Sequence, residues 1–498
     1  MNGTTIFNHY NPKQMHLLYT LSLCLLAALP ALSQDAPNII FMMADDLGNG
    51  DLSYNKAKYD TPSIDSLAEA GVYFERFYTY PGCTPTRSAL MTGRHPLRQG
   101  LWQVVIGRYD DYCLPQSENQ YMLPRLLKEA GYQTAIIGKW HLGHMYPECL
   151  PHARGFDYQF GSSYGLLDYY DWSYENAEDC KENGSHYAPS RHPGANKYFT
   201  DVIAQKCEDY LESWADCSSS PFFLFVPFTA PHVAPYGSGA ARLQIPTDSL
   251  ANAPGSLNTT QKRYWVMMKQ LDYAVSRIVN KVRSLGIEDN TIIIFASDNG
   301  GDVDYAGDND PFRGEKGDLT EGGICVPAIW YHKNTVTTHL DIATPVQIED
   351  FHPTLLKLAG RDISDIEASL DGADIYPLVQ GNSLPARMFL KQYQPVNNAT
   401  SASWAVINGD YKLCNNCGAG TNLYNVVTDP NEFTDLSSAQ PAIRSAMLNF
   451  AQSYQSDVVN RSNNNAISPP SGWNTIQKWA VPETFYDPDY FYYRNPKN

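Results

Sequence analysis

The sequence predicts an α/β fold in which a mostly parallel sheet is flanked by helices and is followed by a smaller C-terminal α+β domain. Continuous apolar stretches, typical of strands buried on both faces, alternate with stretches whose apolar residues have helical spacing. No repeat with the period of a solenoid or propeller is present. With 498 residues, of which 43% are hydrophobic, the chain can bury a large core.

The predicted elements follow one another in a regular alternation. Thr61, Pro62 and Ser63 open the first helix, because proline is favoured in a first helical turn, and Gly131 stops the second helix. A threonine cap is expected at the start of the longest helix, and Gly286 follows its end. The predicted strands are residues 38–44, 132–138, 221–228 and 291–296, and the predicted helices are residues 61–70, 123–130 and 260–284.

A domain boundary is expected near residue 385, where a Tyr-rich segment begins. Residues 386–498 are predicted to form the smaller domain, and residues 34–385 the main one. Within the smaller domain, residues 404–413 are typical of a β-hairpin whose turn contains Asn408, Gly409 and Asp410.

Residues 1–33 are predicted to be a signal peptide. Lys13 precedes an apolar run over residues 17–29, and small residues at 31–33 form a cleavage site before Gln34. No later stretch has the roughly 18 apolar residues of a transmembrane helix. We therefore expect a protein of the secretory pathway, either secreted or lysosomal. The net charge of −17 argues against a general nucleic-acid binder, because phosphate contacts need clustered cations.

The cysteine content agrees with this compartment, since disulfides form in the secretory pathway. Removal of Cys24 with the signal peptide leaves nine of the ten cysteines, so at least one thiol is expected to be unpaired. The pair Cys414 and Cys417 either closes a tight loop or, as the less favoured alternative, binds zinc. Two other pairs flank predicted elements, namely Cys113 with Cys149 and Cys207 with Cys217, and four glycosylation sequons begin at Asn183, Asn258, Asn398 and Asn460.

Polar side chains follow four predicted strands at the point where each strand ends. Because the carboxyl ends of strands in an open α/β sheet meet at one edge, these side chains are expected to converge. The oxygen ligands among them suit a hard cation such as Ca²⁺ or Mg²⁺, although either acidic pair alone is also a common loop start. The four groups are Asp45-Asp46, Lys139-Trp140-His141, Pro231-His232 and Asp298-Asn299.

A second signal lies in residues 83–87, Cys-Thr-Pro-Thr-Arg. Pro85 suits the first turn of a helix, which places Cys83 at the positive N-terminal end, where an anion or a lowered pKa of the thiol is favoured. The alternative is that Cys83 is half of a disulfide, as most cysteines in secreted proteins are.

With these motifs in order, the chain resembles the type I sulfatases of the alkaline phosphatase superfamily, and most closely their arylsulfatase B-like branch. The resemblance runs from about Pro37 to beyond Asp371. It implies an alkaline-phosphatase-like fold, with residues 34–385 as the sulfatase catalytic domain. The motifs that carry it are residues 44–48 (Ala-Asp-Asp-Leu-Gly), the Cys-x-Pro-x-Arg signature at 83–87, residues 138–143, residues 230–232, residues 297–300 and residues 314–316.

The resemblance also implies roles for individual residues. A formylglycine-generating enzyme would convert Cys83 to Cα-formylglycine, whose hydrate is the nucleophile. One Ca²⁺ ion would be held by Asp45, Asp46, Asp298 and Asn299 together with residue 83. Arg87 would fix the hydrate, Lys139 and Lys316 would bind the sulfate oxygens, His141 would act as base on the hydrate, and His232 would protonate the leaving oxygen.

The expected reaction is hydrolysis of a sulfate ester, either an aryl sulfate or a sulfated sugar such as N-acetylgalactosamine 4-sulfate. Two alternatives remain open: a phosphate or phosphonate ester hydrolase of the same superfamily, and a non-catalytic glycan-binding relative. The acidic loop 302–310 leads into Lys316. If this loop borders the site, its charge predicts a preference for small or singly sulfated substrates over long polyanionic glycans.

Overall fold

A computed structural model describes residues 36–455 except 56–57, 106–111, 175–176, 194–195, 219, 247–248 and 394–402. The chain divides into two compact units, Met1–Ala36 and Pro37–Asn498, and the description below concerns the second. The predicted signal peptide and the sequons at Asn398 and Asn460 lie outside the described residues.

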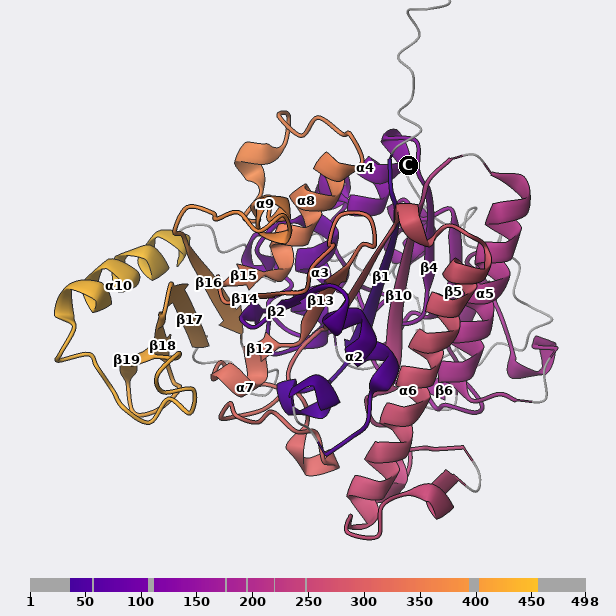
Figure 1. Ribbon diagram of the computed structural model, residues 1–498, viewed down its shortest axis with the longest axis horizontal. Coiled ribbons are helices and arrows are strands. Elements are labelled where there is room, and N and C mark those ends of the chain that lie inside the picture. The colour runs from indigo at the N-terminus through magenta and orange to yellow at the C-terminus, as the bar shows by residue number, and fades with distance from the viewer. Residues whose placement is uncertain are drawn as a thin grey trace, which may run out of the picture. The chain divides into compact units, whose positions relative to one another are not determined.

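The main sheet has ten strands in the order β14-β2-β13-β11-β1-β10-β4-β5-β8-β9. Its central strands β1, β10, β4 and β5 lie side by side in Figure 1. Its five central strands, from β11 to β5, run parallel, as the sequence predicted. Antiparallel strands extend the sheet at both sides, through β13 and β8. The strands are β1 (Asn38–Asp45), β2 (Val72–Phe74), β4 (Gln133–Ile137), β5 (Tyr158–Ser162), β8 (Cys180–Glu182), β9 (Ser185–His186), β10 (Phe222–Pro231), β11 (Thr291–Ser297), β13 (Ala328–Tyr331) and β14 (Leu340–Ile342).

Helices cover both faces of this sheet. The helices α5 and α6 pack on each other and on β10, and α2 packs on α6. A second group, α3, α4 and α8, packs together, and Phe351 of α8 contacts Phe41 of β1. The helices are α2 (Pro62–Glu69), α3 (Cys83–Thr92), α4 (Leu123–Glu129), α5 (Phe199–Cys217), α6 (Thr259–Ser284), α7 (Glu321–Ile324), α8 (Phe351–Leu358), α9 (Tyr376–Val379) and α10 (Pro441–Gln455).

The alternation of side chains along β1 determines which way its last residue faces. Ile40, Met42 and Ala44 belong to the core shared with α2, α5 and α6. Successive residues of a strand point to opposite faces, so Asp45 lies on the same side as Phe41, the side of α3 and α8. The strand pattern therefore directs Asp45 toward the helix that begins with Cys83.

A four-stranded antiparallel sheet, β16-β17-β18-β19, follows the main body. The predicted hairpin is confirmed, because β17 pairs with β18 across a turn at Gly409 and Asp410. One face of this sheet packs with Tyr78 and Ile324 of the main body, and the other packs with α10. The boundary at residue 386 stays a prediction. The strands are β16 (Met388–Tyr393), β17 (Ser403–Asn408), β18 (Tyr411–Asn415) and β19 (Thr421–Asn425).

Two small sheets complete the described strands. The three-stranded sheet β12-β3-β15 consists of Cys325–Val326, Phe77–Tyr78 and Val346–Gln347, and the two-stranded sheet pairs β6 (Ser173–Tyr174) with β7 (Ala177–Glu178). No helix among the described residues combines the length and apolar character that a membrane crossing needs.

One sequence expectation about α6 was wrong. The helix begins at Thr259, and its N-cap is Asn258 rather than a threonine. The side chain of Asn258 accepts a hydrogen bond from the amide of Gln261 at 3.0 Å, and the Gln261 side chain accepts one from the Asn258 amide at 3.0 Å. This reciprocal pair satisfies two amides that a helix start otherwise leaves unbonded.

The cysteines divide into disulfides and free thiols. Disulfides join Cys113 to Cys149 and Cys414 to Cys417. The second of these corrects the zinc alternative, because sulfurs bonded to each other offer no thiolate to a metal. At least one unpaired thiol was expected, and the free thiols of the described region are Cys83, Cys180, Cys207, Cys217 and Cys325.

Candidate active site

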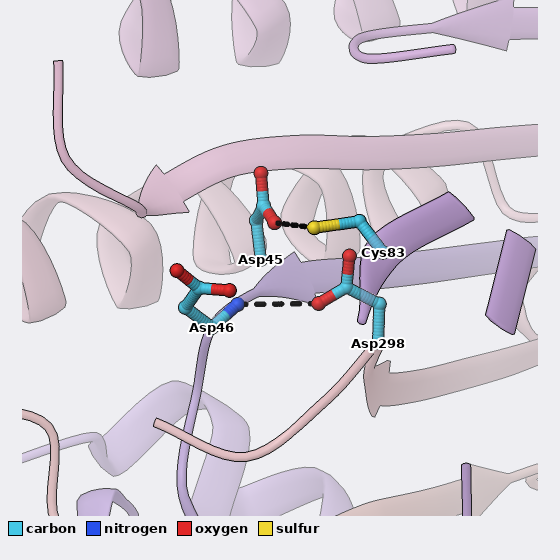
Figure 2. A group of neighbouring side chains, drawn as sticks. All are labelled: Asp45, Asp46, Cys83 and Asp298. Carbon is cyan, nitrogen blue, oxygen red and sulfur yellow. Dashed lines mark hydrogen bonds between the residues drawn. The ribbon is translucent and has the colours of Figure 1, made fainter. Parts of the chain in front are cut away.

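The carboxyl end of β1 supplies two of the predicted acidic residues. Asp45 is the last residue of the strand and is fully buried. Asp46 adopts a left-handed backbone conformation, with φ of 65°, and its amide donates to Oδ1 of Asp298 at 3.2 Å. This conformation costs free energy in a residue with a side chain, so contacts around the site must hold it. The turn brings both carboxylates into one place (Figure 2).

The start of α3 brings Cys83 to the same place. Gly82 precedes the helix in an extended conformation, and Cys83 is the first helical residue. The Cys83 thiol donates to Oδ1 of Asp45 at 3.4 Å (Figure 2). The expectation of a lowered thiol pKa was wrong, because burial raises the pKa of this thiol and it is protonated at neutral pH. The sequence prediction that Cys83 opens a helix is confirmed.

Ligand atoms of Asp45, Asp46, Cys83 and Asp298 lie within 4.8 Å of one another. Burial, followed by the charge of Asp45, raises the pKa of Asp298 to about 6. Asn299 donates from Nδ2 to Oδ1 of Asp46 at 2.8 Å, whereas its Oδ1 is buried without a hydrogen-bond partner. An unsatisfied amide oxygen beside three carboxylates is an arrangement that a hard cation stabilises.

Three cations surround the acidic group. Arg87 donates from Nε and Nη2 to Oδ2 of Asp298, at 3.1 and 2.7 Å. The ammonium of Lys139 lies 2.5 Å from Oδ2 of Asp45, and the side chains of both are fully buried. Lys316 lies 2.7 Å from Oδ2 of Asp46, and its side chain is 27% exposed. Lys316 is therefore the most exposed of the three cations.

His232 contacts Lys316 and Asp46 from the end of β10. Its Nε2 lies 2.9 Å from Nζ of Lys316 and 3.3 Å from Oδ2 of Asp46. Burial lowers the pKa of His232 to about 3, although Asp46 acts in the opposite direction. Its Nδ1 lies 2.8 Å from the carbonyl of Val233, and because a carbonyl only accepts, Nδ1 carries the proton.

His141 follows β4 in the chain and is buried beside the cations. Burial, followed by the charge of Lys139, lowers the pKa of His141 well below its usual value. Its ring is therefore neutral at neutral pH. Every candidate that the sequence placed at a strand end thus lies in or beside this group of charges.

The acidic loop 302–310 reaches the site at one residue. Burial, followed by the charge of Asp46, raises the pKa of Asp302 to about 6, and Lys316 acts in the opposite direction. Asp308 instead pairs with Lys58 at 2.7 Å, and its amide donates to Asp51 at 2.9 Å. Asp302 therefore lies close enough to Asp46 and Lys316 for their charges to act on its carboxyl.

Sequence reasoning missed several residues that support the site. The segment from Gly48 to Asp51 packs against the acidic loop, since the Gly50 amide donates to the Asp308 carbonyl at 2.8 Å. The hydroxyl of Tyr264 donates to the buried Asp51 at 2.7 Å. The only sequence signal for this contact is the composition of residues 48–51, Gly-Asn-Gly-Asp, because glycine allows another backbone segment to approach closely.

Comparison with known proteins decides the family. Residues 37–361 match the family model for Sulfatase. The chain belongs to the sulfatase family. Arylsulfatase J of Mus musculus is 31% identical over 85% of this chain and 76% of its own length. N-acetylgalactosamine-6-sulfatase of Sus scrofa is 30% identical over 94% of each chain.

Solved structures agree with this assignment. The crystal structure of Ps i-CgsB in complex with k-i-k-neocarrahexaose has a TM-score of 0.78 and 27% identity, over 91% of this chain and all of that one. PsFucS1 sulfatase from Pseudoalteromonas sp. has the same fold, with a TM-score of 0.68 at 22% identity. The predicted family and alkaline-phosphatase-like fold are therefore confirmed. This sulfatase is a sulfuric ester hydrolase, whereas its arylsulfatase B-like branch stays a prediction.

Proposed function

We propose that this sulfatase hydrolyses the sulfate ester of a sulfated sugar with Cα-formylglycine at position 83 and one Ca²⁺ ion. The observation that carries the proposal is the buried acidic group with the unsatisfied Oδ1 of Asn299, beside which Cys83 opens a helix.

The residues present fit a calcium ion. Asp45, Asp46 and Asp298 offer carboxylate oxygens and Asn299 an amide oxygen, which are the ligands that Ca²⁺ prefers. The charges of Arg87, Lys139 and Lys316 match those of the three carboxylates, so a bound divalent ion would make the site net positive, which favours an anionic sulfate ester. Bound there, the ion supplies Lewis-acid stabilisation for the negative charge that develops on the sulfate oxygens.

Position 83 fits the proposed modification. The signature Cys83, Pro85 and Arg87 is intact, and the thiol itself is protonated and poorly nucleophilic. A formylglycine hydrate at this position would supply two hydroxyl groups on one carbon, one to serve as the nucleophile and the other to allow the aldehyde to re-form. The maturation partner is a formylglycine-generating enzyme, and the predicted signal peptide takes the chain to the secretory pathway, for secretion or the lysosome.

The remaining side chains have distinct tasks in the proposal. Lys139 and Lys316 bind the sulfate oxygens, and Arg87 orients residue 83. His141 would accept a proton from the hydroxyl of a formylglycine hydrate at position 83. His232 would protonate the leaving oxygen from Nε2, which lies 2.9 Å from Nζ of Lys316.

The substrate proposal rests on the relatives and on the site. The relative from Sus scrofa is named N-acetylgalactosamine-6-sulfatase, after a sulfated sugar. The solved structure of Ps i-CgsB contains a sugar ligand, k-i-k-neocarrahexaose. The sequence instead suggested N-acetylgalactosamine 4-sulfate or an aryl sulfate. Assays with 4-sulfated and 6-sulfated N-acetylgalactosamine and with an aryl sulfate separate these candidates.

Three measurements test the proposal. Peptide mass analysis of enzyme from a secreting host should show formylglycine at position 83, and Cys83→Ala should be inactive. Chelation should remove activity and lower the melting temperature, because a ligand that binds only the folded state stabilises it. Activity retained with unmodified cysteine, or retained in chelator with no metal bound, contradicts the proposal. Faster hydrolysis of a phosphate diester than of any sulfate ester would favour the alternative of a phosphate or phosphonate ester hydrolase. A protein that turns over no ester at all would instead be the non-catalytic glycan-binding relative.

A further inference from the structure

His141 is fixed in place by contacts with three other parts of the chain. Its backbone has φ of 59°, a left-handed conformation that residues with a side chain rarely adopt. Its amide donates to the carbonyl of Ser163 at 3.3 Å, and its carbonyl accepts a hydrogen bond from the Thr84 hydroxyl at 3.0 Å. Such a backbone persists only where its surroundings hold it, which these contacts do.

Thr84, the residue after Cys83, closes a ring of hydrogen bonds with His141 and Val105. Its hydroxyl donates to the His141 carbonyl and accepts from the Val105 amide at 3.1 Å. The Val105 carbonyl in turn lies 2.9 Å from Nε2 of His141. All three residues are buried, so water cannot replace any of these bonds without an opening of the site.

This ring of bonds determines the tautomer of His141. The Val105 carbonyl can only accept, so Nε2 carries the hydrogen, and a neutral imidazole then has its lone pair on Nδ1. Nδ1 is buried and has no hydrogen-bond partner among the described residues. Nδ1 is thus the proton-accepting atom of the ring, and nothing in the described chain occupies it.

Gly165 packs against the imidazole of His141 near Nε2. A Cβ atom at this position would lie 2.4 Å from Nε2 and 2.5 Å from Cε1 of His141. Bare backbone therefore lets the imidazole approach closely, and any side chain here would push Nε2 away from Val105.

We propose that Thr84 is a positioning residue that holds His141 as the Nε2-protonated tautomer, in which Nδ1 is the accepting atom of the ring. The inference rests on the proposed role of His141 and adds the accepting atom and the residue that orients it. Thr84 directly follows residue 83 in α3, so the helix that carries residue 83 also carries the residue that orients His141.

Substitutions at Thr84 test the hydroxyl directly. Thr84→Val keeps the shape but removes both hydrogen bonds, whereas Thr84→Ser keeps the hydroxyl. Thr354→Val is the matched control, because the Thr354 hydroxyl also donates to a buried carbonyl, that of Asp350 at 2.6 Å, and accepts from a buried amide, that of Ile375 at 2.9 Å. All rates are divided by the formylglycine content that peptide mass analysis gives, since Thr84 lies inside the modified signature.

The expected result is a fall in kcat of about tenfold in Thr84→Val with KM unchanged, because a disoriented base loses part of its usual contribution of about 10²–10⁴. Thr84→Ser should restore kcat. Thr354→Val should lower the melting temperature as much as Thr84→Val does but keep the wild-type kcat. Nitrogen NMR of histidine-labelled enzyme, assigned with His141→Gln, should show the Nε2-protonated tautomer in the wild type and a tautomer mixture in Thr84→Val.

Two outcomes overturn the inference separately from the proposed function. A wild-type kcat in Thr84→Val, or an Nδ1-protonated ring in the wild type, overturns the role of Thr84 even if His141→Gln is inactive. A fully active His141→Gln overturns the proposed base itself. Gly165→Ala gives a second route: it should lower kcat, whereas Gly255→Ala, where an added Cβ meets open space, should not. Equal kcat values in these two glycine variants also count against the positioning of His141.

Discussion

At the scale of single residues, the site holds its cations against carboxylates before any substrate is present. Lys139 shows the arrangement most clearly, since its ammonium and the Asp45 carboxylate are both fully buried. A buried ammonium stays charged only beside such a partner. The protein has therefore already removed water from the charge that we propose contacts the sulfate, and little reorganisation remains for the reaction.

Replacement of Lys139 tests this arrangement. Lys139→Met keeps the volume of the side chain but removes its charge, so kcat should fall by about 10²–10³, the usual effect of losing one charge-stabilising donor. The exposed Lys128, which pairs with Asp157, provides the control: Lys128→Met should keep wild-type kcat. Steady-state kinetics on an aryl sulfate and circular dichroism of both variants give the comparison. A change confined to KM would show that Lys139 binds substrate without favouring the transition state.

His352 makes the stability of the fold dependent on pH. Burial lowers the pKa of His352 to about 4 from its usual 6.5, and its Nε2 lies 2.6 Å from the carbonyl of Tyr121. The unfolded chain binds a proton below pH 6.5, whereas the folded chain does so only near pH 4. The free energy of unfolding therefore keeps its full value above pH 6.5. As the pH falls from 6.5 toward 4, His352 lowers this free energy by about 3 kcal/mol in total.

The variant His352→Gln should reduce this pH dependence. It keeps a side-chain donor for the Tyr121 carbonyl but does not titrate. Urea unfolding of wild type and variant at pH 7 and pH 4.5 measures the difference, and the wild type should lose about 2 kcal/mol more than the variant between the two pH values. Parallel losses in the two proteins would show that His352 does not carry the pH dependence.

At the scale of single elements, the start of α6 shows how one residue serves two purposes. Asn258 caps the helix through its side chain and also begins a glycosylation sequon. Asn258→Ala should lower the free energy of unfolding by about 1 kcal/mol, because the cap is lost. Asn258→Ser removes the sequon but keeps a capping hydroxyl, so it should leave the stability close to that of wild type. Denaturant unfolding of unglycosylated protein compares the two, and equal losses would argue against the capping role.

Elements with strong local patterns were predictable from the sequence. The apolar run of β1 ends at Asp45, and the central strands β10 and β11 have the same continuous apolar character. Pro85 and the following residues indicated α3. These segments carry their own signal, because strands buried on both faces and capped helices need particular residues at particular positions.

The contacts that the sequence did not show join distant segments. Thr84, Val105, His141 and Gly165 meet in space, yet no pattern in any one segment indicates the others. The short strands β8 and β9 at one side of the main sheet were also missed, since two or three residues carry no periodicity. The charged groups of the site could be predicted because their residue types and their places after strands are visible in the sequence. The residues that hold them in position could not be predicted, because their contacts form only through tertiary packing.

At the scale of the whole molecule, an anion-binding site lies in a chain with a net charge of −17. The buried cations are already paired with carboxylates, so the field that an approaching ligand meets is dominated by acidic groups outside the site. Asp302 is an acidic residue outside the proposed ligand set, and its charge interacts with that of Lys316, the most exposed of the three cations. A single sulfate ester that enters the site meets the cations, whereas further anionic groups of the same ligand stay outside.

This asymmetry predicts a preference for singly sulfated substrates over long polyanionic chains. At low salt, the ratio of kcat/KM for a monosulfated disaccharide to that for a chondroitin sulfate chain should exceed one, and Asp302→Asn should lower it about fivefold, which corresponds to about 1 kcal/mol for one nearby charge. Asp216→Asn is the control, because it makes the same change in net charge far from the site. Asp216 is exposed near the end of α5, which leads into the start of β10, whereas the site lies at the other end of that strand. That variant should keep the wild-type ratio. Physiological salt should shrink the effect of Asp302→Asn, because screening acts on exposed charges. If Asp302→Asn and Asp216→Asn give equal kcat/KM ratios at both salt concentrations, the charge of Asp302 does not decide the preference. The preference would then depend on the net charge of the protein or on no electrostatic effect at all.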